Sequence, residues 1–85
     1  MTFHELIDTI SAIDGVRIHF KWLEKRLVLI FWKGHSPIAS VFVDEYEYRK
    51  DYPKLFEMHL DDIFAIDLAL YDFTQTPIEE RELEI

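Results

Sequence analysis

A stretch of strictly alternating side chains constrains the fold of this chain more than any other feature. Residues 16–22 alternate between apolar and polar, and the apolar ones are Val16, Ile18, Phe20 and Trp22. Because successive strand residues point to opposite faces of a sheet, this pattern predicts a strand with one buried face. Residues 27–32 are apolar at every position, which indicates a strand that is covered on both faces.

A third strand is expected over residues 38–43, after a turn at 33–37, and its extension through Tyr48 is an alternative. Short turns between three strands predict an antiparallel meander with 27–32 at its centre, and a fourth strand is an alternative. A two-residue loop at 24–25 fixes which residues face one another. The expected pairs are Ile18 with Phe31, Phe20 with Leu29, and Trp22 with Leu27.

Both faces of this predicted sheet are apolar. The main core face gains Ala39, Val41 and Val43 from the third strand. The opposite face would hold Val28, Ile30, Trp32, Ile38 and Phe42, joined by Tyr46 and Tyr48 if the strand is extended. An apolar surface of this size is rarely left in water, so we expect a helix or a second subunit to cover it.

The sheet is preceded by a helix with clear ends. Thr2 and Glu5 have the spacing of a capping box, in which each side chain binds the backbone N–H of the other residue. Apolar residues recur on one helical face over 3–14, and Gly15 supplies the left-handed residue that commonly ends a helix. The sequence therefore predicts a helix over residues 3–14.

A second helix begins either soon after Pro53 or at Asp61, with Asp61 or Asp62 as its N-cap, and ends near Thr74. Its apolar residues form two stripes, and this indicates two packing partners instead of one. The first stripe is Ile63, Ile66, Leu70 and Phe73, and the second is Phe64, Leu68 and Tyr71. Over 77–84 the glutamates predict a short helical or frayed tail. The fold class is α+β, in a single domain over residues 1–85.

Composition excludes several classes of protein. The chain has 85 residues and no cysteine, so disulfides, thiolate zinc sites and thiol catalysis are excluded. Its longest apolar run, 27–32, has six residues and is far too short to cross a membrane. The N-terminal residues lack the basic start and apolar run of a signal peptide, so we expect a cytoplasmic location.

Charge is distributed unevenly along the chain. Residues 1–34 carry five basic and four acidic side chains, whereas residues 35–85 carry four basic and thirteen acidic ones, out of a net charge of −8. The acidic half suggests a basic protein partner, and the alternative is that the two halves attract each other within the fold. The negative average charge repels phosphate and makes nucleic acid an unfavoured partner.

Residues suited to catalysis or metal binding are sparse. His4 and Asp8 lie one helical turn apart and could supply two ligands to a metal ion, but no third ligand is evident. His59 lies close to Asp61 and Asp62, which helix capping already explains. There is no glycine-rich phosphate loop and no nucleophile motif, so we expect no enzyme activity, no catalytic residues, no metal and no cofactor.

The C-terminal stretch from Leu68 to Glu82 reads L-A-L-Y-D-F-T-Q-T-P-I-E-E-R-E. It resembles the ending of small uncharacterised proteins from phages and prophages of Gram-positive bacteria, in which a helix closes with an aromatic residue, Thr-Pro and a Glu-Glu-Arg-Glu-like run. The resemblance implies a phage-encoded accessory protein that acts in the host cytoplasm. It implies no catalytic residues.

Together these features predict a small non-enzymatic interaction protein that forms a homodimer and can bind a basic host protein. The expected self-association or partner surface consists of Phe64, Leu68, Tyr71, Trp32 and Phe42. The alternative is a single-stranded nucleic-acid binder that uses the basic, aromatic sheet face. That surface would consist of Arg17, His19, Lys21 and Trp32.

Overall fold

The first helix begins at the capping box that the sequence predicts. In the computed structural model, which describes residues 1–83, helix α1 spans Phe3–Ser11. The Thr2 hydroxyl accepts from the Glu5 amide at 3.2 Å, and the Glu5 carboxylate accepts from the Thr2 amide at 2.9 Å. The helix ends at Ser11 instead of residue 14, because the Ile13 amide bonds to Ile10 and tightens the last turn. Gly15 follows with the expected positive φ of 78°.

The sheet has four antiparallel strands in the order β1-β2-β3-β4. Their bounds are β1 Val16–Leu23, β2 Arg26–Lys33, β3 Ser36–Phe42 and β4 Tyr48–Arg49. The three pairs predicted between the first two strands are confirmed. Glu24 and Lys25 have φ angles of 51° and 69°, which identify a type I′ turn. That turn has the twist that a two-residue hairpin needs.

A β-bulge moves one predicted residue to the other face. Phe31 pairs with Ala39, but the next residue, Trp32, pairs with Pro37, so Ile38 is left over. Pro37 has no backbone N–H to donate, and prolines inside sheets occur at such irregularities. The side chain of Ile38 is fully buried in the core. Its predicted position on the opposite face is therefore wrong.

The extension of the third strand through Tyr48 is also wrong. β3 ends at Phe42, and the chain turns over residues 43–47 before β4 pairs back onto β3. Tyr48 is opposite Val41 in this pairing and therefore shares the core face with it. Tyr46 lies outside the strands and is exposed. The sheet is four-stranded because the predicted long strand is divided into two that pair.

The sequence leaves two alternative starts for the second helix, and a separate helix begins near each of them. A 3-10 helix, η1, spans Pro53–Glu57, and α2 spans Leu60–Gln75. His59 is the N-cap of α2 and makes no side-chain capping bond. The prediction that Asp61 or Asp62 caps the helix is wrong, since both lie in its first turn. There their carboxylates interact favourably with the positive end of the helix dipole.

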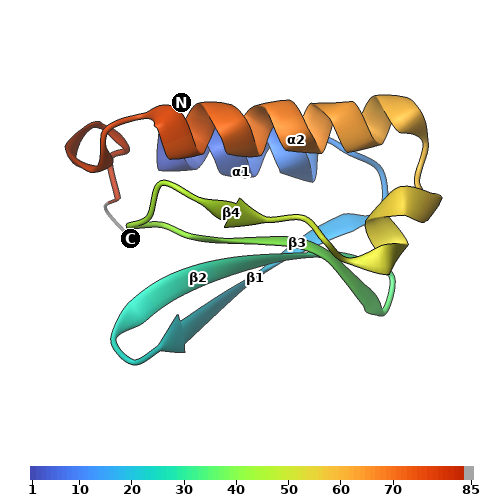
Figure 1. Ribbon diagram of the computed structural model, residues 1–85, viewed down its shortest axis with the longest axis horizontal. Coiled ribbons are helices and arrows are strands. Elements are labelled where there is room, and N and C mark those ends of the chain that lie inside the picture. The colour runs from blue at the N-terminus through green and yellow to red at the C-terminus, as the bar shows by residue number, and fades with distance from the viewer. Residues whose placement is uncertain (84–85) are drawn as a thin grey trace.

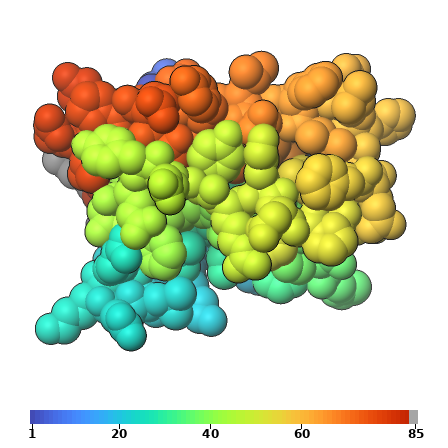
Figure 2. Space-filling view, viewed as in Figure 1, coloured from blue at the N-terminus to red at the C-terminus, as the bar shows by residue number. Residues whose placement is uncertain are grey.

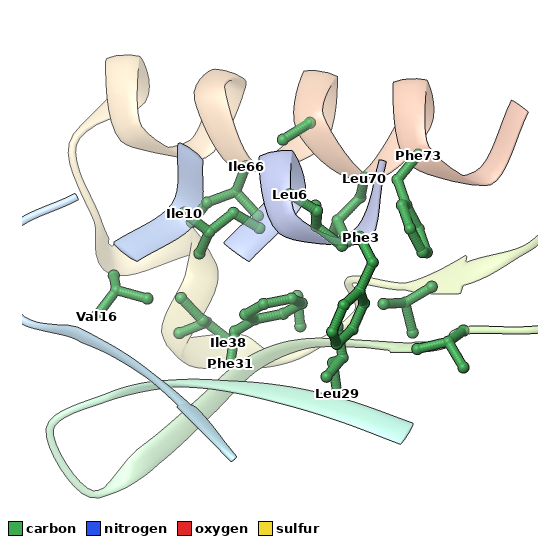
Figure 3. Close-up of a cluster of buried hydrophobic side chains, with 14 of the residues drawn as sticks. Phe3, Leu6, Ile10, Val16, Leu29, Phe31, Ile38, Ile66, Leu70 and Phe73 are labelled. Atoms are coloured by element: carbon green, nitrogen blue, oxygen red, sulfur yellow. The ribbon is translucent and has the colours of Figure 1, made fainter. Parts of the chain in front are cut away.

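Both α-helices lie on one face of the sheet, as Figure 1 shows. The core fills the space between the helices and this face (Figure 3). Its members include Leu6 and Ile10 of α1, Ile66, Leu70 and Phe73 of α2, and Leu29 and Phe31 of β2. The α+β arrangement predicted from the sequence is therefore confirmed. Within residues 1–83, the opposite sheet face has no α-helix over it.

Candidate interaction surfaces

Helix α2 carries an apolar stripe that points away from the core. The stripe consists of Leu60, Phe64, Leu68 and Tyr71, which are 63%, 54%, 68% and 57% exposed. Their spacing of three and four residues places them along one side of the helix. The buried residues Ile66, Leu70 and Phe73 hold the other side against the sheet. We call these four exposed residues the outer stripe.

The outer stripe contains all three helix residues predicted for self-association. Leu60 was missed because the later predicted start placed it before the helix. An aromatic side chain has a surface of roughly 150–250 Å². With the exposed fractions given above, the four side chains together form an apolar patch of about 400–600 Å². This is as large as the largest apolar patch on a typical monomer.

Arg81 fastens the end of α2 to the turn between β3 and β4. Its fully buried guanidinium donates to the carbonyls of Thr74 at 3.0 Å, Thr76 at 2.8 Å, Val43 at 2.8 Å and Glu45 at 2.7 Å. The two threonine carbonyls are among those left without partners at a helix C-terminus, where a cation also interacts favourably with the helix dipole. Burial lowers the pKa of Arg81 from its ordinary value. We call this set of contacts the arginine clamp.

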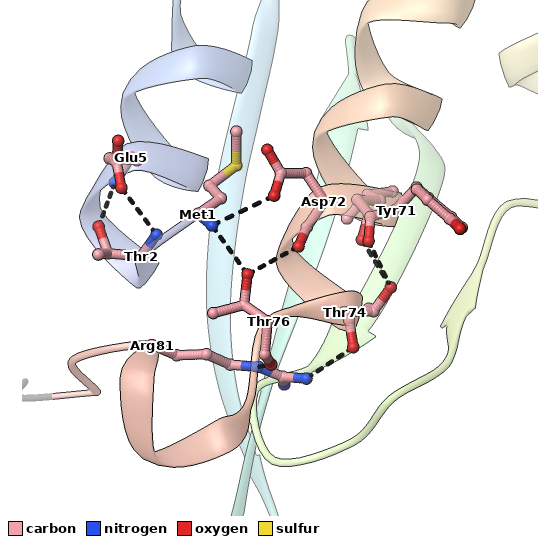
Figure 4. Close-up of polar contacts among 9 residues, drawn as sticks. Met1, Thr2, Glu5, Tyr71, Asp72, Thr74, Thr76 and Arg81 are labelled. Atoms are coloured by element: carbon pink, nitrogen blue, oxygen red, sulfur yellow. Dashed lines mark hydrogen bonds and ion pairs between the residues drawn. The ribbon is translucent and has the colours of Figure 1, made fainter.

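The tail is anchored over residues 77–83, where the helical alternative of the prediction is correct and the frayed one is wrong. A 3-10 helix, η2, spans Ile78–Glu80 and leads into the clamp. The amide of Phe3 donates to the carbonyl of Arg81 at 2.6 Å, which ties the start of α1 to the tail. Figure 4 shows the adjacent contacts, in which the Met1 amine reaches Asp72 and Thr76. Residue 84 of the predicted tail lies outside the described residues.

The helix-free face of the sheet carries the other predicted residues. The register places Arg17, His19 and Lys21 of β1 on this face, together with Trp32 and Phe42. The exposed His19 ring lies 5.4 Å from that of Trp32, which is half-buried. The indole N–H of Trp32 is buried and has no hydrogen-bond partner within residues 1–83.

Long polar side chains cover much of this face. The Arg26 guanidinium lies 4.4 Å from the centre of the Phe42 ring and bonds to Asp44 and Glu45. Arg49 lies over the Tyr52 ring at 5.0 Å. A cation over an aromatic face gains electrostatic attraction while its stem covers apolar surface. The prediction that a helix covers this face is therefore wrong, and neighbouring side chains cover part of it instead.

A groove of about 370 Å³ remains open on the helix-free face. Val28, Ile30 and Phe42 supply its apolar residues, and Ser40 bonds to the Tyr52 hydroxyl at 3.1 Å beside them. Its charged residues are Lys21, Glu45, Glu47 and Arg49. Because cations and carboxylates alternate around it, the groove has no strong preference for phosphate.

A polar contact also joins β4 to the flank of α2. Asp67 accepts from the Tyr48 hydroxyl at 2.6 Å and from the Lys50 ammonium at 2.7 Å. Burial, with the neighbouring Asp67 carboxylate, raises the pKa of Tyr48 to about 12. The hydrogen bonds from Lys50 and Tyr48 lower the pKa of Asp67. This contact ties the flank of α2 to β4, in addition to the core packing of its buried side.

The candidate metal ligands do not come together. Within the described part of the chain, no group of three or more histidine or acidic side chains is placed to hold a metal ion. His4 borders a shallow hollow with Glu79, Glu82 and Leu83. His59 serves as the N-cap residue of α2.

Comparison with known proteins gives no relative from which a role could be transferred. No family model, no curated protein and no solved structure matches the chain. Neither helix among residues 1–83 has the length and apolar content that a membrane crossing requires. The candidate surfaces therefore have to be interpreted from their own geometry and chemistry.

Proposed function

We propose that this protein is a small non-enzymatic interaction protein that self-associates through the outer stripe of α2. The observation that carries this proposal is the stripe itself, whose four apolar side chains remain more than half exposed. Apolar surface of this extent and regularity on a soluble domain is typical of a contact surface. The arginine clamp and the Tyr48–Asp67 contact support the proposal because they help to hold the stripe outward.

A two-fold pairing of α2 with its copy would suit this surface. Leu60 and Tyr71 are eleven residues apart, so the stripe runs for roughly 16 Å along the helix. Doubling the exposed patch gives about 800–1,200 Å² buried in total, which reaches the lower end of stable protein interfaces. We therefore expect a dimer that dissociates on dilution.

Analytical ultracentrifugation of the full chain tests this proposal. The wild type should sediment as a dimer at tens of micromolar and shift to monomer on dilution. Leu68→Lys should sediment as a monomer at every concentration, because a charge cannot be buried at the centre of an apolar contact. Phe56→Lys is the matched control, since Phe56 is equally exposed at 68% but lies outside α2. A wild type that is monomeric throughout contradicts the proposal.

We also propose that the protein is a phage-encoded accessory protein of the host cytoplasm, and the C-terminal ending from Leu68 to Glu82 supports this. A basic host protein is the partner we propose for the acidic half. Five of its carboxylates are already in ion pairs, namely Asp44, Glu45, Asp51, Asp67 and Asp72. The carboxylates of residues 79–82 are exposed and have no ion pair among residues 1–83.

Calorimetric titration with a lysine-rich peptide tests the acidic surface. Replacing Glu79, Glu80 and Glu82 by glutamine should weaken binding, whereas Asp51→Asn should leave it nearly unchanged. Raising the salt concentration should weaken it further, because exposed charges are screened. Equal losses in both variants would show that only net charge matters.

Single-stranded nucleic-acid binding is the second candidate function, and one observation favours it. Arg17, His19, Lys21 and Trp32 share the helix-free face, which is the arrangement that single-strand binders use. Trp fluorescence should be quenched by an oligothymidylate at low salt and recover as salt rises. Trp32→Leu should abolish the quenching, while Trp22→Leu, on the other face, should retain it. No quenching at low salt rejects this candidate.

A further inference from the structure

The edge of β1 has backbone groups that no strand uses. Among residues 1–83, β1 pairs with β2 alone, so one side of it is a free edge. In the type I′ turn at Glu24 and Lys25, the flanking residues Leu23 and Arg26 form a hydrogen-bonded pair. Hydrogen-bonded and non-bonded pairs then alternate along the ladder. The N–H and C=O groups of Ile18, Phe20 and Trp22 therefore point to the free edge.

This edge lacks several of the devices that usually protect a sheet, and its charged side chains, Arg17 and Lys21, lie on one face only. β1 has eight residues, contains no proline and pairs with β2 without a bulge. Six of its eight residues are exposed. The hairpin projects from the body of the molecule, as the cyan part of Figure 2 shows. A long, exposed edge with unpaired backbone groups is a template for an added strand.

The two faces of β1 differ in chemistry. Arg17, His19 and Lys21 lie on the helix-free face, and none has a carboxylate partner among residues 1–83. Phe20 and Trp22 lie on the core face, yet they are 51% and 65% exposed because the helices do not extend over the hairpin. An added strand would therefore meet the cations Arg17 and Lys21 beside the His19 ring on one face and aromatic rings on the other.

A second copy of β1 fits this edge poorly. In an antiparallel pairing of two identical strands, Arg17, His19 and Lys21 would lie opposite one another or on adjacent positions of the same face. Like charges directly across a sheet are destabilising. The charges instead complement a strand whose residues on that face are carboxylates.

We propose that the β1 edge binds an extended peptide segment of another protein in which acidic and apolar residues alternate. The peptide backbone pairs with Ile18, Phe20 and Trp22, its carboxylates face Arg17, His19 and Lys21, and its apolar side chains contact Phe20 and Trp22. Backbone bonds give such an added strand its affinity, and the alternate side chains give it specificity. This site is separate from the outer stripe of α2, so the peptide-binding proposal can be correct whether or not the protein self-associates through that stripe.

Amide hydrogen exchange of the full chain is the direct test. The probe is a capped seven-residue peptide of alternating glutamate and valine, and a lysine–valine peptide is its matched control. The acidic peptide should slow exchange at Ile18, Phe20 and Trp22, whose amides point outward. Exchange at Arg17, His19 and Lys21 should change little, because these amides already bond to β2. The lysine peptide should slow none of them.

Two pairs of variants separate the contribution of the backbone N–H to peptide binding from that of the charge. Phe20→Pro removes one outward N–H, so it should lose peptide binding that Phe20→Ala, which keeps the N–H, retains in weakened form. Lys21→Glu should weaken binding by about fivefold, whereas Lys25→Glu, in the turn and off the edge, should not.

Four results would overturn the proposal. The first is no slowing with the acidic peptide, and the second is equal slowing with both peptides. A third is concentration-dependent slowing at Ile18, Phe20 and Trp22 without peptide, because a second copy would then occupy the edge. The fourth is an oligothymidylate perturbing Arg17 and Lys21 when the acidic peptide does not, because the basic face would then bind nucleic acid.

Discussion

The outer stripe of α2 and the helix-free sheet face are both apolar surfaces without a helix over them, yet they differ in how far other side chains cover them. On the sheet face, Arg26 lies over Phe42 and His19 lies against Trp32, so the rings of Phe42 and Trp32 are half-buried. On α2, Leu68 and its neighbours have no such covering and remain mostly exposed.

The difference follows from the geometry of the two elements. Neighbouring strands lie about 5 Å apart, so a long side chain on one strand can lie over a ring on the next. The outward side of a surface helix has no neighbour within reach. A sheet can therefore cover surplus apolar surface with its own residues, whereas the outward side of α2 stays exposed.

The largest expected effect concerns the arginine clamp, because α2 presents its stripe only while its inner side is held. Arg81→Met should lower the free energy of unfolding by about 3–5 kcal/mol, since it leaves buried carbonyls without donors. Denaturant titration measures this. Arg49→Met, at an exposed arginine, is the control and should cost far less. Equal costs would mean that the clamp does not hold the helix.

The stability of the protein should respond differently to a leucine-to-alanine substitution on the buried and on the exposed side of α2. Leu70→Ala, at a fully buried position, should cost about 2–5 kcal/mol of stability in a monomeric background. Leu68→Ala should change it by no more than about 0.5 kcal/mol, because Leu68 is exposed. The Leu68→Ala variant should instead dissociate at higher concentration in sedimentation. A large stability loss at Leu68 would show that the stripe belongs to the core.

Raising the pH should weaken the contact that ties the flank of α2 to β4. The folded pKa of Tyr48 is raised to about 12, above the unfolded value of about 10. Its contribution is therefore complete below pH 10 and is lost as the pH rises through 12. The expected loss is up to about 2 kcal/mol.

Unfolding free energies at pH 8 and pH 11.5 measure the Tyr48 effect. Tyr48→Phe should show a smaller drop between the two than the wild type, while Tyr46→Phe, at an exposed tyrosine, should behave as the wild type does. An unchanged drop in Tyr48→Phe would assign the alkaline loss to other groups.

The smallest effect should come from uncovering the sheet face. Arg26→Ala removes the guanidinium from Phe42 and should increase the fluorescence of an apolar dye, with a slight loss of stability. Arg26→Lys keeps the charge but loses the planar stacking, so it should be intermediate. If dye binding does not change, the side chain is not what covers the ring.

Local patterns predicted the elements well. The capping box at Thr2 and the alternation in β1 each depend on residues close in sequence, and both are confirmed. The hairpin register follows from the same alternation and a two-residue loop. Phe64, Leu68 and Tyr71 were found together because helical spacing alone groups them.

What could not be predicted depends on long-range partners. Nothing near Arg81 in sequence indicates burial, because Val43 and Glu45 are brought to it by the fold. Ile38 changed faces because of one bulge at Trp32. A single proline after a turn was the available signal for that bulge, and such a signal does not specify its position.

The bond between Phe3 and Arg81 also has a consequence for the order of assembly during synthesis. It joins residues 78 positions apart, near the two extremes of the described chain. Contacts of such separation form late, because the intervening loop has to close first. The hairpin can pair as soon as it leaves the ribosome, but its core face stays bare until α2 and residue 81 have been made. A nascent chain of this protein therefore depends on α2 and residue 81 to conceal the core face of residues made before them.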